Sequence, residues 1–177
     1  MKGRTGAFGK AAAVVIFFLA LIALLPLQVK AEALQETIPQ TVRQRSLLDD
    51  VDMVSDEVNL LQRSGHLDFG RISLTKLSPT RASIFGTTQA YHACPELQLN
   101  LYVDKYNTET GKWSQWRYWE FSEKNVDSLT KSLEIIVQSG YYYSVRGYHI
   151  CFHGNVIESA ETITDGLYIG ITDSPVN

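Results

Sequence analysis

The sequence lacks the local motifs that mark common enzyme active sites. It has no Gly-x-Ser-x-Gly turn, no glycine loop of the phosphate-binding type, no His-Glu-x-x-His pair and no Cys-x-x-Cys pair. Acidic residues cluster between positions 49 and 57, where they are typical of a solvated surface. Three others, Glu120, Glu134 and Glu158, lie on or near predicted strands, and the sequence places no two of them across a cleft. We therefore expect a protein that is not an enzyme.

Clustered basic residues are also missing. No run of lysine or arginine interleaved with aromatic residues occurs, which excludes nucleic acid and an anionic membrane surface as expected partners. The chain has 16 basic and 19 acidic residues. It shows no repeat and no low-complexity tract, and its 177 residues suit one ordinary domain.

The first 31 residues have the three parts of a secretory signal. Lys2, Arg4 and Lys10 give a positive start, residues 11–27 are apolar, and small or apolar residues at 29 and 31 suit cleavage after Ala31. Cleavage removes four cations and no acids, leaving a net charge of −7. We expect a secreted, extracellular protein, and a membrane association only if the segment stays uncleaved as an anchor.

Residues 32–65 are predicted to form a linker with one short amphipathic helix at about 47–63. The apolar positions of the helix recur at steps of four, three, four and three residues, at Leu47, Val51, Val54, Val58 and Leu61. Ser46 with Asp49 supplies a capping signal, and Gly65 a stop. Such a helix either packs on its own domain or pairs with a partner.

Residues 66–177 are predicted to form the β domain. After Phe69 the pattern changes to a period of two, with turn residues every eight to twelve positions. Seven strands are predicted, at 71–77, 81–91, 97–106, 113–121, 128–138, 141–152 and 167–171. In the third, Leu97, Leu99, Leu101 and Val103 point inward. This count and spacing favour an all-β fold, a seven-stranded immunoglobulin-like β-sandwich.

Two resemblances support this architecture. The alternating residues Tyr141, Tyr143, Val145 and Gly147 resemble the inward face of strand F in fibronectin type III domains, where a tyrosine near the strand start turns its hydroxyl back to the backbone. Several stretches also resemble a family of small secreted proteins from Gram-positive bacteria, a domain of unknown function: residues 83–91, 99–104, 140–149, 154, 158–159, 162–164 and 166–170. That likeness covers roughly Gly70 to Gly170 and implies export and one β domain, with no catalytic residues to transfer.

The most distinctive local feature is a Tyr-His-x-Cys motif that occurs twice, as Tyr91-His92-Ala93-Cys94 and as Tyr148-His149-Ile150-Cys151. In the proposed sandwich, the second and sixth strands end at the same end of opposite sheets, so the two motifs converge. Three hypotheses stay open for them. The cysteines form a disulfide, or they are unpaired and partly buried, or a metal site that suits zinc uses His92, Cys94, His149, Cys151 and His153.

The second candidate site is an aromatic face. Alternation along residues 113–121 places Trp116 and Tyr118 on one side of the strand, and Tyr142, Arg146 and Tyr148 on a neighbouring strand could join them. Flat rings there would suit a sugar or a peptide, whereas the simpler interpretation is cross-strand pairing that stabilises an exposed sheet.

The leading hypothesis is therefore a secreted, non-enzymatic β-sandwich module that binds an unknown ligand or protein at or beyond the cell surface. Its alternatives are a metal-dependent enzyme that uses the histidine and cysteine cluster, and a structural or assembly protein that associates through the helix. The sequence predicts no oligomeric state.

Overall fold

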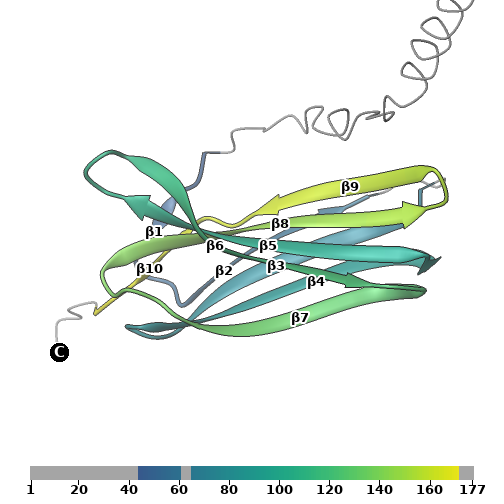
Figure 1. Ribbon diagram of the computed structural model, residues 1–177. Helices are drawn as coiled ribbons and strands as arrows, with labels where there is room; N and C mark the ends of the chain where they lie inside the picture. The colour runs from purple at the N-terminus through teal and green to yellow at the C-terminus, as the bar shows by residue number, and fades with distance from the viewer. Residues whose placement is uncertain (1–43, 61–64, 172–177) are drawn as a thin grey trace, which may run out of the picture. The chain divides into compact units, whose positions relative to one another are not determined.

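Ten strands make up the part of the chain that the structure, a computed structural model, describes: residues 44–60 and 65–171 (Figure 1). In chain order they are β1 (Leu47–Leu48), β2 (Met53–Asn59), β3 (Leu67–Ser78), β4 (Arg81–Cys94), β5 (Glu96–Asn107), β6 (Lys112–Glu123), β7 (Val126–Ile136), β8 (Tyr141–His153), β9 (Val156–Ile163) and β10 (Gly166–Ile169). These ranges contain no helix. The predicted signal segment lies outside them, and so do residues 32–43 and 61–64 of the predicted linker.

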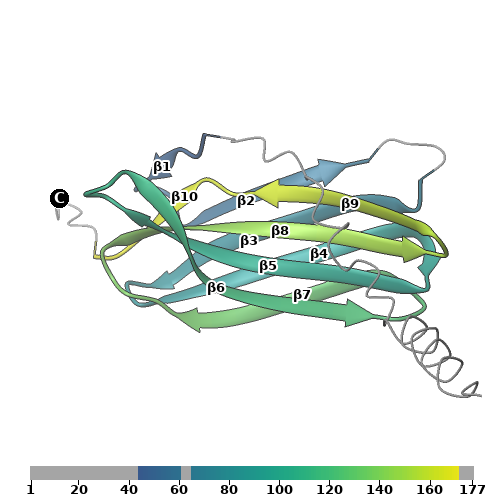
Figure 2. The ribbon, with the colours of Figure 1, turned by 45° about the horizontal axis from the view of Figure 1, so that its top comes forward.

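The strands form two sheets. One has the order β1-β10-β8-β5-β6, with β9 also paired to β8, and the other has the order β2-β3-β4-β7. Figure 2 shows the sheets as two layers, with β8 and β5 over β3 and β4. The predicted all-β sandwich is confirmed, and each of the seven predicted strands has a counterpart in β3 to β8 or β10.

The core lies between the inner faces of the sheets. Leu97, Leu99, Leu101 and Val103 of β5 are fully buried, as their alternation predicts, and so are residues of the opposite sheet such as Ile72. Burying one such aliphatic side chain contributes about 1.5–3 kcal/mol, so this alternation is the main source of the sandwich's stability.

The predicted helix is wrong. Residues 47–48 and 53–59 are strands, and β2 pairs with β3 from Met53 opposite Thr75 to Asn59 opposite Phe69. In β2, Val54 is buried, and the Asp56 carboxylate accepts the backbone N–H of Ile163 at 2.8 Å. The spacing of the valines fits both the helical period and the period of two of a strand. Because Asp56 is an acid at an inward-facing position, the alternation of apolar and polar residues in β2 is hidden. The assembly hypothesis therefore loses the helix on which it rested.

The strand count also needs correction, from seven to ten. Besides β1 and β2, the sequence analysis missed β9, which pairs with β8 from Val156 opposite His153 to Ile163 opposite Arg146. The tyrosine contact implied by the fibronectin resemblance is present. Tyr143 donates its hydroxyl to the backbone oxygen of Gln138 at 3.0 Å, and the Gln138 backbone N–H donates to that hydroxyl at 3.1 Å.

A buried ion network ties the N-terminal segment to the larger sheet. Arg45 Nη1 and Arg146 Nε each lie 2.8 Å from Asp104 Oδ2, and Arg146 Nη2 lies 3.0 Å from Oδ1. The Asp104 side chain is only 4% exposed. Removing one partner of a buried pair leaves an uncompensated charge, so the network fixes where β1 enters the fold.

Candidate metal centre

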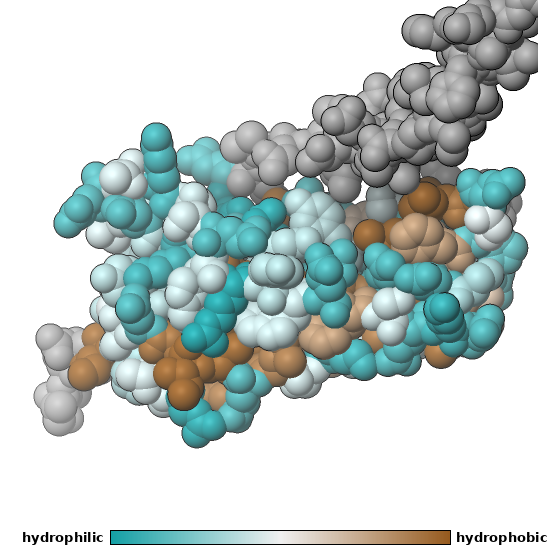
Figure 3. Space-filling model, in the orientation of Figure 1, coloured by the Kyte–Doolittle hydropathy of each residue, from teal (hydrophilic) through white to brown (hydrophobic). Residues whose placement is uncertain are grey.

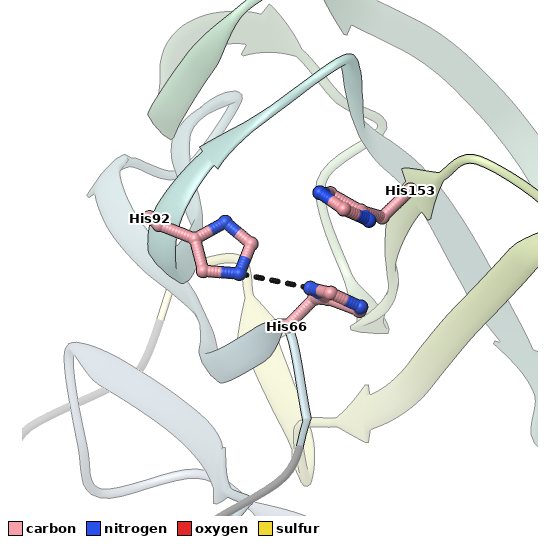
Figure 4. A group of neighbouring side chains, drawn as sticks. All are labelled: His66, His92 and His153. Atoms are coloured by element: carbon pink, nitrogen blue, oxygen red, sulfur yellow. Dashed lines mark hydrogen bonds between the residues drawn. The ribbon is translucent and has the colours of Figure 1, made fainter.

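Three histidines meet at one end of the sandwich. His66 directly precedes β3, His92 lies near the end of β4, and His153 is the last residue of β8 (Figure 4). Because β3 and β4 are antiparallel, the start of β3 lies beside the end of β4. The β8 strand of the other sheet reaches the same end, so three segments distant in sequence each supply one imidazole.

The ring nitrogens are close enough to share one ion. One nitrogen from each histidine lies within 4.8 Å of the others. His66 Nδ1 and His92 Nε2 are 2.8 Å apart, and the His66 and His153 rings stack with centroids 4.0 Å apart. A tetrahedral zinc ion at about 2.1 Å from its ligands holds them roughly 3.4 Å apart. The stacked His66 and His153 rings must turn out of their parallel arrangement before both in-plane lone pairs point at one ion.

The backbone of His66 is fixed from both sides. The Glu158 carboxylate of β9 accepts the backbone N–H groups of His66 and Leu67, each at 2.7 Å to the same oxygen. The backbone oxygen of His66 accepts the N–H of Tyr91 at 2.9 Å. Hydrogen bonds to a residue that ligates a metal help to orient it toward the ion.

The cysteines lie beside this cluster and bind each other. Cys94 and Cys151 form a disulfide with Cα atoms 6.4 Å apart, and it joins β4 of one sheet to β8 of the other. Cys94 is two residues from His92, and Cys151 is two residues from His153. A bonded pair offers no thiolate, so the disulfide hypothesis fits this geometry and cysteine ligation does not.

His149 does not join the cluster, although the sequence analysis grouped it there. Its ring is fully buried, with Nδ1 2.9 Å from the Thr88 hydroxyl and Nε2 2.9 Å from the Thr162 hydroxyl. Burial lowers the pKa of His149 to about 4, against a smaller opposing effect of Asp56. With both nitrogens occupied by hydroxyls, the neutral ring is a packing element of the core.

Of the five predicted metal ligands, the structure thus brings together His92 and His153 and adds His66. His66 is absent from the predicted ligands because it directly follows the predicted linker, residues 32–65, and belongs to no motif. The sequence does contain a signal that places His66 at the cluster. The turn between the first two predicted strands sets the residue before the first strand beside the end of the second, and hence beside His92.

The predicted aromatic face is partly present. Tyr118 is 58% exposed and stacks on Tyr102 with ring centroids 6.0 Å apart. Tyr148 meets the Tyr102 ring edge-on at 5.4 Å, and the Arg146 guanidinium lies 5.2 Å from its centroid. Tyr102, which the prediction missed, is therefore the centre of the group.

Trp116 and Tyr142 lie elsewhere. A β-bulge pairs Val103 with Arg117 and Asp104 with Gln115, so Trp116 is an extra residue and its ring turns inward, 5.5 Å from that of Tyr143. Tyr142 instead donates its hydroxyl to Asp49 at 2.6 Å, and that bond, with burial, raises the pKa of Tyr142 to about 12. The strict alternation assumed for this strand is wrong at the bulge.

Comparison with known proteins places the chain in a family. The search of curated proteins finds no match. In the described ranges the structure has no helical segment capable of crossing a bilayer. The family model described as "Family of unknown function (DUF6147)" matches residues 44–166, which span β1 to the start of β10 and include all three clustered histidines. The chain belongs to this family of unknown function.

Proposed function

We propose that this domain is an exported, non-enzymatic binding module that holds a transition-metal ion through His66, His92 and His153. The carrying observation is that one nitrogen from each ring lies within 4.8 Å of the others at the surface. Neutral imidazoles suit zinc, copper and nickel, and three protein ligands leave a fourth position for water or a partner group. The family of unknown function is compatible with this role and supplies none itself.

Export is the second part of the proposal. The charged start, apolar stretch and small residues of positions 1–31 support a cleaved signal. The Cys94–Cys151 disulfide agrees with this, because disulfides persist in oxidising compartments.

The pairing orders β3-β4-β7 and β10-β8-β5-β6 of the seven predicted strands support the immunoglobulin-like assignment.

Zinc titration of single-ligand variants tests the metal proposal. The protein for this experiment is the chain from residue 32 onward, which contains every strand of both sheets. It is expressed in an oxidising compartment so that the disulfide can form. We expect it to bind one zinc ion by calorimetry. His66→Ala, His92→Ala and His153→Ala should each weaken zinc binding by more than the 10–100-fold that is typical of removing a group that only orients a ligand.

The fourth histidine provides the internal control for that titration. The triple alanine variant retains His149, which is buried and bonded through both ring nitrogens. Zinc binding should therefore vanish in the triple variant. Equal affinity in the wild type and the triple variant would refute the assignment.

A second candidate function is sugar binding on the outer face of β6, β5 and β8. A surface hollow of about 240 Å³ lies along the strands beside Tyr118 and Tyr102, lined by Gln98, Asn100, Glu120, Phe121 and Ser122. An exposed ring can stack on a sugar while amide, carboxylate and hydroxyl groups bond its hydroxyls. Tyr118→Ala should abolish retention on chitin, whereas Tyr141→Ala, an exposed tyrosine elsewhere, should not. Equal retention of all three proteins, or none by the wild type, would remove this candidate.

A further inference from the structure

The disulfide joins the same two strands that carry two of the three histidines. Cys94 and His92 share the end of β4, while Cys151 and His153 share the end of β8. These strands belong to different sheets, so no backbone ladder joins them. The covalent bond therefore links β4 to β8 across the two layers beside the histidine cluster, where the Glu158 carboxylate of β9 also bonds the backbone of His66 and Leu67.

That link is one of the few points that hold the end of β4. Its pairing with β3 runs to Ala90, and its pairing with β7 passes from Gln89 directly to Cys94. The segment between them carries His92 and is held by the bond from the Tyr91 backbone N–H to the His66 oxygen. The Cys94–Cys151 bond and the pairing of Cys94 with Val126 hold the other side of this short segment, two residues from His92.

We infer that the Cys94–Cys151 disulfide and metal occupancy of the three-histidine site are coupled, so that each stabilises the other. This rests on the proposed metal-binding function. With the disulfide intact, His92 is held near His66 and His153, and a metal gains three ligands with little ordering cost. With the bond broken, the end of β4 keeps its pairing at Ala90 and Cys94 but loses its link to β8. More ordering is then left to the binding step, and the affinity for the metal falls.

The coupling is reciprocal. A dithiol reductant passes two electrons and two protons to the protein, so the S–S bond breaks, two cysteine thiols form, and the reductant becomes a disulfide. If the intact bond raises metal affinity by some factor, bound metal must oppose reduction by the same factor. Metal loading is thereby favoured in protein that has already formed its disulfide, which in an exported protein means after export.

The first test compares zinc affinity in the wild type and the Cys94→Ala/Cys151→Ala variant, which has no thiol that could itself bind zinc. We expect the variant to bind more weakly by roughly 5- to 150-fold, the usual range of coupling between sites. Thr162→Val is the matched control, because it loses a hydrogen bond to His149 and weakens the core without touching the cluster. Its zinc affinity should equal that of the wild type.

The second test needs no variant and covers the case in which the double variant fails to fold. The wild type is equilibrated in glutathione redox buffers at fixed free zinc and without zinc, and the fraction reduced is read by thiol alkylation. Zinc at saturating levels should lower the reduction equilibrium constant, and the loss of affinity on reduction should match this factor.

The outcomes separate the inference from the proposal beneath it. If the oxidised wild type binds no zinc, the proposed function fails. If it binds zinc but the thiol-free variant binds equally well, or zinc leaves the reduction equilibrium unchanged, the coupling is overturned and the proposed function stands. Tighter binding after reduction of the wild type would show that the thiols are ligands and would also overturn the coupling.

Discussion

Gly70 of β3 lies directly against the imidazole of His149 on β8, in the opposite sheet. A Cβ atom at position 70 would come within 2.2 Å of the ring carbon Cδ2. Glycine is needed at position 70 because a Cβ atom there would overlap the His149 ring. The close approach of the β3 backbone lets that ring fill the gap between the sheets. This contact explains why His149 belongs to the core.

Gly70→Ala should therefore lower the free energy of unfolding by about 1–3 kcal/mol or more, the usual cost of overpacking. Chemical denaturation measures it. In a His149→Ala background the ring is gone and the added methyl group has room, so the same substitution should cost much less. Equal costs in the two backgrounds would contradict the packing account.

Acid should weaken the fold through His149. Its folded pKa of about 4 lies below the ordinary value of 6.5, so between these values the unfolded chain binds more protons than the folded one. The contribution of about 3 kcal/mol is present above pH 6.5 and is lost as the pH falls to about 4. Unfolding measured over this range should show the slope in the wild type, and His149→Gln should flatten it.

Glu158 should act on the metal site without touching the metal. Its carboxylate holds the backbone N–H groups of His66 and Leu67, so Glu158→Ala should reduce zinc affinity about 10- to 100-fold. Glu134→Ala, which removes an exposed ion pair with Arg81, is the control and should leave zinc affinity unchanged. If both variants bind like the wild type, Glu158 has no positioning role.

Export should leave a defined end on the chain. If residues 1–31 are a cleaved signal, protein recovered from the medium begins at Glu32, which N-terminal sequencing checks. Replacing Ala31 with a bulky residue such as tryptophan should slow processing, because the cleavage site needs small side chains. Protein that stays with the membrane and starts at Met1 would instead support an uncleaved anchor.

The strands of the core could be predicted because alternation leaves a strong trace. In β5 every second residue from Leu97 to Val103 is a buried aliphatic, and no helical period imitates that pattern. The edge strand β2 leaves a weaker trace. Its inward position 56 is an acid that bonds the backbone of β9, and the remaining valines fit a helix as well.

The candidate site could be predicted only in part. The prediction that the two strands finish at the same end of the sandwich was enough to place His92 near His153 and Cys94 near Cys151. His149 was misassigned because alternation tells which face a residue takes and not whether that face meets solvent. Trp116 was misplaced because one bulge in β6 shifts the alternation, and a bulge has no signature in this sequence.

Anomalous diffraction from crystals of the oxidised protein grown with zinc tests the central claim most directly. We predict a zinc peak at about 2.0–2.1 Å from one nitrogen each of His66, His92 and His153. A zinc ion bound at other residues, with these three rings free of metal, would contradict the account.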